Sequence, residues 1–202
     1  MKVHPTAAVV IVLGLLTPTA ADAHLVNSGL GPFYDGALHL ILSPIDIVRL
    51  VTLCLFAAAL GPSSGRAVVV AAPIAWLLAS SVVLASGATT TTTIEILNAV
   101  SLILLGGAVA FNVKPPPLIA GAVAAGYAGF LGFQNGIELR SDNADWVALL
   151  GSTAVASAIM MLVTSFVVSA TSFPARVACR VLGSWASATG LLSIGWLVAA
   201  SR

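Results

Sequence analysis

The chain has 202 residues, of which 59% are hydrophobic and only 7% are charged. Soluble domains carry about 25% charged residues, and a chain of this length has too little interior to bury so much apolar surface. Eight basic against seven acidic residues give a net charge of +1, which lacks the basic excess of a nucleic-acid-binding protein. The composition excludes a soluble enzyme, a disordered chain and a nucleic-acid binder. It predicts an all-α membrane protein.

The first 23 residues have the pattern of a secretory signal peptide. A basic start at residues 1–4 precedes an apolar run, residues 7–16, that is too short to span a bilayer comfortably. Residues 21–23 then match the small-residue cleavage rule. We expect cleavage after Ala23, which makes His24 the first mature residue. The alternative is an uncleaved first helix.

Six apolar segments follow, each close to the roughly 20 residues that a membrane-spanning helix needs. Glycine, proline and polar runs, which favour turns, separate them. The predicted spans are residues 38–60, 67–86, 94–113, 117–135, 146–169 and 178–200. No segment has the composition of a soluble domain. Residues 24–202 are therefore predicted to form a single domain, a bundle of six transmembrane helices.

The charged residues predict the orientation of this bundle. With the mature N-terminus outside, four basic residues fall in cytoplasmic loops and two fall outside, as the positive-inside rule requires. The first group is Arg66, Lys114, Arg176 and Arg180, and the second is Arg140 and Arg202. The acidic residues of the mature chain then lie at or near the outer face: Asp35, Asp46, Glu95, Glu138, Asp142 and Asp145. We expect a protein of the bacterial inner membrane with both mature termini on the periplasmic side.

The start of the first span carries a polar constellation. Asp35 and His39 are four residues apart, and His39 and Asp46 are seven apart, so a continuous helix places them on one face. Pro44, which lies between His39 and Asp46, can instead kink the helix or restart it with Ser43 as the N-cap. Imidazole and carboxylate groups together suit nickel, cobalt, zinc or copper, and a free His24 could add an amine and a second imidazole. Each residue also has a structural interpretation. Asp46 can form an ion pair with Arg49, three residues on; His39 can be an interfacial hydrogen-bonding residue; Asp35 can cap a turn.

The fourth span is rich in glycine at intervals of three or four residues. Such spacing lets another helix approach closely. The glycines expected to contribute are Gly126, Gly129, Gly132 and Gly136. Helix packing alone explains them; the functional alternative is that close packing brings Glu138 up to the first span.

The beginning of the mature chain resembles the HupE/UreJ family, the hydrogenase and urease accessory membrane proteins regarded as nickel or cobalt permeases. The resemblance lies in a signal peptide that ends at a histidine, a glycine-rich segment, and His39 followed after six residues by Asp46. Family members typically have a histidine directly after this aspartate, where the present chain has Ile47.

A second motif of the family, Phe-His-Gly-x-x-His-Gly-x-Glu, is similar to residues 130–138. The glycines and the final Glu138 match, whereas Leu131 and Asn135 stand at the positions of the two histidines. The resemblance thus implies a divergent member with fewer imidazole ligands and a weaker or different cargo. We predict that His39, Asp46 and Glu138 converge on one polar site in the outer third of the bundle, because Asp46 is costly in an apolar run unless a partner compensates its charge.

Two functions are consistent with these features. The first is a divalent-metal permease or metal-uptake accessory protein, which binds nickel or cobalt transiently for metalloenzyme maturation and holds no resident cofactor. The second is a non-transporting membrane scaffold that assembles a metalloenzyme and contacts its subunits. An enzyme is not expected, because the sequence has neither an HExxH motif nor a serine–histidine arrangement. The expected partners are the lipid bilayer, a metal ion and metalloenzyme subunits, and not nucleic acid.

Overall fold

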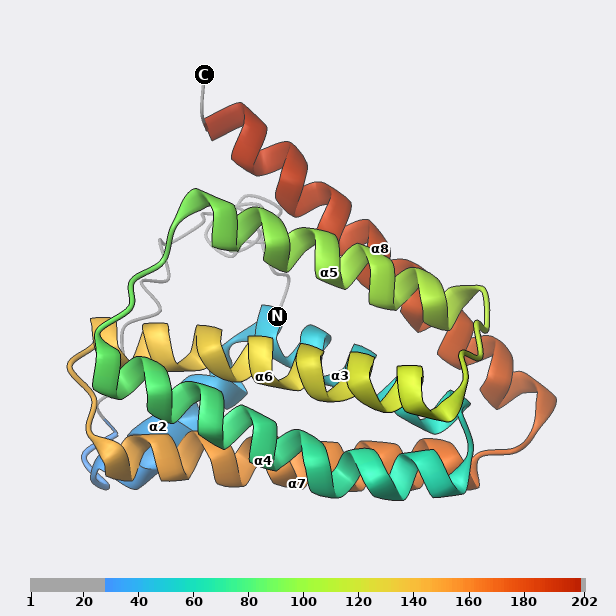
Figure 1. The fold of residues 1–202 in the computed structure, drawn as a ribbon, viewed down its shortest axis with the longest axis horizontal. Coiled ribbons are helices and arrows are strands. Elements are labelled where there is room, and N and C mark those ends of the chain that lie inside the picture. Colours follow the sequence, from blue (N-terminus) through green and yellow to red (C-terminus); the bar gives the residue numbers. More distant parts are fainter. Residues whose placement is uncertain (1–27, 201–202) are drawn as a thin grey trace, which may run out of the picture.

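The computed structural model describes residues 28–200, and all regular secondary structure in this part of the chain is helical. The helices shown in Figure 1 are α2 (Pro32–Leu42), α3 (Pro44–Ala59), α4 (Pro62–Ser86), α5 (Thr92–Ala110), α6 (Pro117–Ser141), α7 (Trp146–Ser169) and α8 (Phe173–Ala200). Five of them are long and apolar enough to cross a membrane, and the count is six if the bent pair α2 and α3 forms one span. The signal peptide predicted for residues 1–23, and His24, lie outside the described residues.

Prolines and short polar side chains set the helix starts. Helices α2, α3, α4 and α6 each have a proline at their first position, where the missing N–H would have no partner within the helix anyway. Helix α7 begins after Asp145, whose carboxylate accepts hydrogen bonds from the backbone N–H groups of Val147 and Ala148, both at 2.9 Å. Local sequence therefore determines where most of the spans begin.

The span predicted for residues 38–60 is divided in two at Pro44, one of the outcomes expected for a proline at this position. Pro44 has no N–H to continue the helical ladder, and the residue before it, Ser43, is extended at φ −88° and ψ 98°. The chain therefore bends by 76° between α2 and α3. The other predicted spans are helical with some ends shifted. The second begins earlier, at Pro62, and the third ends earlier, at Ala110; the fourth continues to Ser141 and the last begins earlier, at Phe173.

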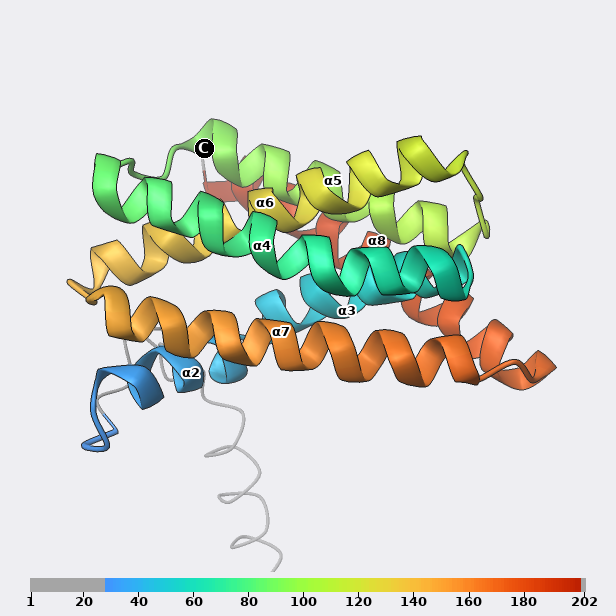
Figure 2. The ribbon, with the colours of Figure 1, turned by 60° about the horizontal axis from the view of Figure 1, so that its bottom comes forward.

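Helix α3 is the centre of the bundle. It contacts every other helix in the described part of the chain, and its apolar run from Leu50 to Ala57 is almost completely buried. Around it, the most extensive contacts join α4 to α6, α5 to α8, and α2 to α7. Figure 1 shows α5 and α8 together along the upper side, and Figure 2 shows α2 lying along α7.

The outer surface is apolar, as a bilayer requires. On α4, the side chains of Val70, Ile74, Leu78 and Val82 recur every four residues and are each more than half exposed. A stripe of this kind on the outside of a soluble protein would cause aggregation, whereas in a bilayer it meets lipid chains.

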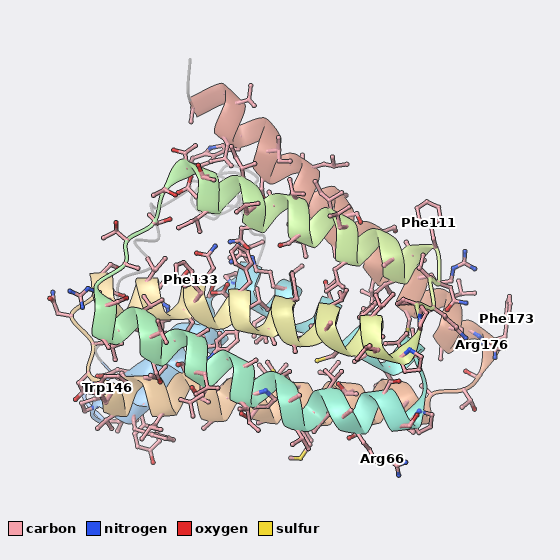
Figure 3. The ribbon with its side chains drawn as sticks, in the orientation of Figure 1. Arg66, Phe111, Phe133, Trp146, Phe173 and Arg176 are labelled. Carbon is pink, nitrogen blue, oxygen red and sulfur yellow. The ribbon has the colours of Figure 1, made fainter. Side chains whose placement is uncertain are left out.

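Most basic residues lie at one end of the bundle and the acidic residues lie at the other. This follows because successive helices from α3 to α8 run in opposite directions, which places every second loop at the same end (Figure 1). Arg176 and Phe173 lie at one end and Trp146 at the other (Figure 3). The end with Arg176 holds the loops before α4, α6 and α8, with Arg66, Lys114 and Arg180. The other end holds α2, the start of α3 and the loop after α6, where the acidic residues gather.

Candidate functional site

His39 and Glu138 meet near the acidic end of the bundle. His39 is in the last turn of α2, and its Nε2 donates a hydrogen bond to Oε2 of Glu138, in the last turn of α6, at 3.2 Å. Ninety-nine residues separate the two in sequence. The His39 side chain is 5% exposed and that of Glu138 is 38% exposed, so the carboxylate lies on the accessible side and the imidazole behind it.

Asp46 has other partners. Its carboxylate accepts hydrogen bonds from Ser43 Oγ at 2.6 Å and from Arg49 Nη1 at 2.8 Å. The second is the ion pair that the spacing of three residues predicts. Both side chains are largely buried: that of Arg49 is 13% exposed and that of Asp46 is 10% exposed. Asp46 lies in the first turn of α3, where the helix dipole also stabilises a negative charge. Its charge is therefore balanced within its own helix.

The one-face arrangement of His39 and Asp46 is wrong, because the bend at Ser43 separates their helices. Asp46 and Arg49 still act electrostatically on Glu138, and Asp46 and Asp142 act on His39. No group of three or more histidine, cysteine, aspartate or glutamate side chains within residues 28–200 is arranged to hold a metal ion. The structure thus brings together two of the three expected residues and leaves the third nearby.

Asp35 is turned toward the N-terminal side of α2. Its Oδ1 accepts hydrogen bonds from the backbone N–H of Ser28 at 2.7 Å and from the hydroxyl of the same residue at 2.5 Å. Although Asp35 is four residues before His39, its hydrogen bonds close the segment that leads into α2.

A buried polar network lies one helical turn inward from Glu138. Asn135 Nδ2 donates hydrogen bonds to Ser152 Oγ of α7 at 3.1 Å and to Ser80 Oγ of α4 at 3.5 Å. Ser80 in turn donates to the carbonyl of Gly132 at 2.6 Å, and all these groups are buried. The two serines were not predicted, because a hydroxyl on one helix carries no local signal of its partner on another.

Two of the glycines on α6 form its contact with α4. A Cβ at Gly132 would collide with the backbone of Trp76, and one at Gly136 would lie 2.8 Å from the Ser80 carbonyl oxygen. Gly129 is looser, since its nearest neighbour would be 3.8 Å away, and at Gly126 a Cβ would meet no atom within 4 Å. Close packing therefore places α6 on α4 rather than directly on the first span.

Helix α2 is fixed to α7 by two glycines that the sequence analysis did not single out. A Cβ at Gly36 would collide with the backbone of Ala148, and one at Gly151 would collide with the carbonyl of Phe33. The backbones of the two helices are thus in direct contact. This contact holds His39 in position opposite Glu138.

The family model for HupE/UreJ proteins matches residues 10–193, which is most of the chain and includes every part of this site. The chain belongs to the HupE/UreJ family. Comparison with curated proteins and with solved structures found no match. The motif positions can now be placed on the HupE/UreJ bundle: Leu131 is buried in the core, and Asn135 belongs to the serine network. Both positions that resemble the family's second-motif histidines are occupied by residues that pack or bond within the protein.

Proposed function

We propose that this HupE/UreJ protein is a permease or uptake accessory protein for a divalent transition metal, nickel or cobalt, in the bacterial inner membrane. The observation that carries the proposal is the contact between His39 and Glu138, made across 99 residues of sequence at a break in the first span. Discontinuous helices are a recurrent device for binding ions within membrane transporters. On this proposal the protein is not an enzyme.

The geometry of the pair suits two neighbouring ligands of one ion. Nitrogen and oxygen ligands lie about 2.0–2.2 Å from such a metal, which places adjacent ligand atoms about 3 Å apart. The observed separation of 3.2 Å between Nε2 and Oε2 is in this range. An ion that replaced the shared proton would therefore need only a small shift of the side chains. The last turn of α2 adds the negative end of a helix dipole beside His39.

Two protein ligands are too few for a permanent site, and this favours passage over storage. Water would complete the coordination sphere, and weak binding permits release. Asp46 stays paired with Arg49 in this scheme and is not a direct ligand. The accessible Glu138 would meet the ion first and the buried His39 second.

The segregation of charge supports the orientation in the membrane. The end that holds Arg66, Lys114, Arg176 and Arg180 would face the cytoplasm by the positive-inside rule. The acidic end, with the His39–Glu138 pair, would face the periplasm, where a cation would be captured.

Uptake of radioactive nickel or cobalt into cells tests the proposal. His39→Gln and Glu138→Gln each remove one ligand with little change in size, and we expect each to reduce uptake by roughly tenfold or more at an unchanged level of protein in the membrane. Asp35→Asn is the matched control. It also removes a carboxylate from α2, but this carboxylate is hydrogen-bonded to Ser28 and not to His39 or Glu138. Normal uptake by the Gln variants would refute the proposal.

The alternative is a membrane scaffold that assembles a metalloenzyme without moving metal. The observation that favours it is the use of Leu131 and Asn135 for packing and internal hydrogen bonds. Such a protein would bind metalloenzyme subunits at its periplasmic face. A strain that lacks the chain but takes up metal normally, while its metalloenzyme remains unassembled, would support the scaffold over the permease.

A further inference from the structure

A cavity opens at the basic end of the bundle, away from the His39–Glu138 pair. It has a volume of about 470 Å³, within the range of roughly 300–1,000 Å³ that is usual for ligand pockets. It lies where the C-terminal ends of α3, α5 and α7 meet the first turns of α8. Figure 3 shows Arg176 and Phe173 in this region.

Three cations line the cavity: Lys114, Arg176 and Arg180. Within the described part of the chain, no carboxylate forms an ion pair with any of them, because the acidic residues lie at the other end. Three like charges around one cavity repel each other and raise the local positive potential.

The positions of these cations are set by the fold. Lys114 precedes three consecutive prolines, residues 115–117, which restrict the loop between α5 and α6. The turn before it is closed by a hydrogen bond from the N–H of Val113 to the carbonyl of Ala108 at 2.8 Å. Arg180 Nε donates to the carbonyl of Ala110 at 2.8 Å and so caps the end of α5. The fold therefore keeps the backbone of Lys114 and the side chain of Arg180 at the cavity.

Beneath the charges the wall is apolar. Leu55, Val109, Val167 and Val177 line it, contributed by four different helices. A small inorganic anion would leave this surface without a partner. A molecule that carries both a negative headgroup and hydrocarbon chains would match both parts of the cavity.

We propose that this cavity binds the phosphate group of an anionic phospholipid. Arg176 and Lys114 contact the phosphate oxygens, with Arg180 adding positive potential, and the acyl chains lie along the apolar wall. Guanidinium groups suit phosphate because their fixed fork donates two hydrogen bonds to it, and basic pockets between transmembrane helices on the cytoplasmic side are known to hold anionic headgroups.

A structural role could also place cations here, since the negative ends of α3, α5 and α7 converge at this end. Arg180 serves in this way, whereas no hydrogen bond within the described residues engages the side chain of Lys114 or Arg176. Arg66 provides the comparison: it lies at the same end of the bundle but does not line the cavity, and in Figure 3 it points away from Arg176.

The test uses the full chain, purified in a neutral detergent, and titrates it with short-chain phosphatidylglycerol. Phosphatidylcholine of the same chain length and inorganic phosphate are titrated in parallel. We expect saturable binding of phosphatidylglycerol that is about fivefold weaker in Arg176→Gln and in Lys114→Gln, and unchanged in Arg66→Gln. We expect clearly weaker binding of the zwitterionic lipid and of inorganic phosphate.

Three results would overturn the proposal: no saturable binding, equal weakening by all three variants, or inorganic phosphate binding as tightly as the anionic lipid. The first would leave the cations with a structural role, the second would indicate general surface charge, and the third would assign the site to a soluble phosphate. The thermal stability of each variant without lipid shows whether it is folded. If Arg176→Gln does not fold, Arg176→Lys replaces it, because this variant keeps the charge but loses the two parallel N–H donors of the guanidinium group.

Discussion

At the scale of single residues, the polar groups at the start of the first span divide into two pairs with different partners. His39 is joined to Glu138 across the bundle, whereas Asp46 is joined to Arg49 within one helix. The first pair has an accessible carboxylate, and on the proposed function it exchanges its proton for a metal ion. In the second pair both side chains are largely buried, and the pair is suited to fixing the start of α3.

The Asp46–Arg49 pair gives a prediction about stability. Asp46→Asn or Arg49→Met leaves the other charge buried without a partner, which typically costs about 3–5 kcal/mol. We expect each single variant to lower the melting temperature of the detergent-purified protein clearly. The double variant should lose much less than the sum of the two, because it leaves no unpaired charge. Additive losses would show that the two side chains do not depend on each other.

How far this site could be predicted depends on the sequence distance between its members. The spacing of three residues was enough to pair Asp46 with Arg49. His39 and Glu138 were associated through their places in two motifs and through the expected close packing of the glycine-rich fourth span, since no periodicity connects residues 99 positions apart. The interhelical bonds of Asn135 to Ser80 and Ser152 were beyond prediction, because serines in apolar helices usually bond to their own backbone.

At the scale of helices, the residues at the helix ends determine which bounds can be predicted from the sequence. Residues 146–169 were predicted as a span and form α7 with those bounds, because Asp145 caps its start. The fourth span is predicted to end at residue 135, ahead of the polar stretch of residues 140–145. In the bundle, Gly136, Ile137 and Leu139 are buried against neighbouring helices, and α6 continues to Ser141.

The glycines of α6 give a prediction with an internal control. Gly132→Ala places a methyl group against the backbone of Trp76, which cannot shift as a side chain can, and should destabilise the protein by about 1–3 kcal/mol. Gly126→Ala makes the same chemical change where no atom lies within 4 Å. It should be neutral or stabilising by up to roughly 1 kcal/mol, because alanine favours the helix.

Thermal unfolding in detergent, followed by far-ultraviolet circular dichroism, measures both glycine variants. Equal effects of the two substitutions would mean that α6 and α4 are not in close contact at Gly132.

At the scale of the whole molecule, the separation of charge is the feature that sequence predicted most directly. Loop positions follow from turn residues, and helices that alternate in direction place every second loop at the same end. The central position of α3 could not be predicted in this way. Its apolar run resembles those of the lipid-facing helices, and only the packing shows that α3 is surrounded by the others.

The predicted topology can be tested with a fusion after Arg202. If α2 and α3 together cross the membrane once, α8 ends on the same side as the start of α2. In the proposed orientation this side is the periplasm. We expect an alkaline phosphatase fused there to be active and a green fluorescent protein fused there to be dark after export by the general secretion route. The reverse pattern would place the basic end outside and contradict the orientation.

The direct backbone contact between α2 and α7 has a mechanical consequence. In the chain, only Ser43 joins α2 to α3, so α2 is a short rigid segment attached at a single hinge residue. Because Gly36 and Gly151 leave no gap between α2 and α7, α2 cannot tilt toward α7. A movement that draws His39 away from Glu138 must therefore separate α2 from α7 or slide one helix along the other. On the proposed function, opening of the site to an ion would thus be accompanied by a change in this glycine contact, far from the ligands in sequence but adjacent in space.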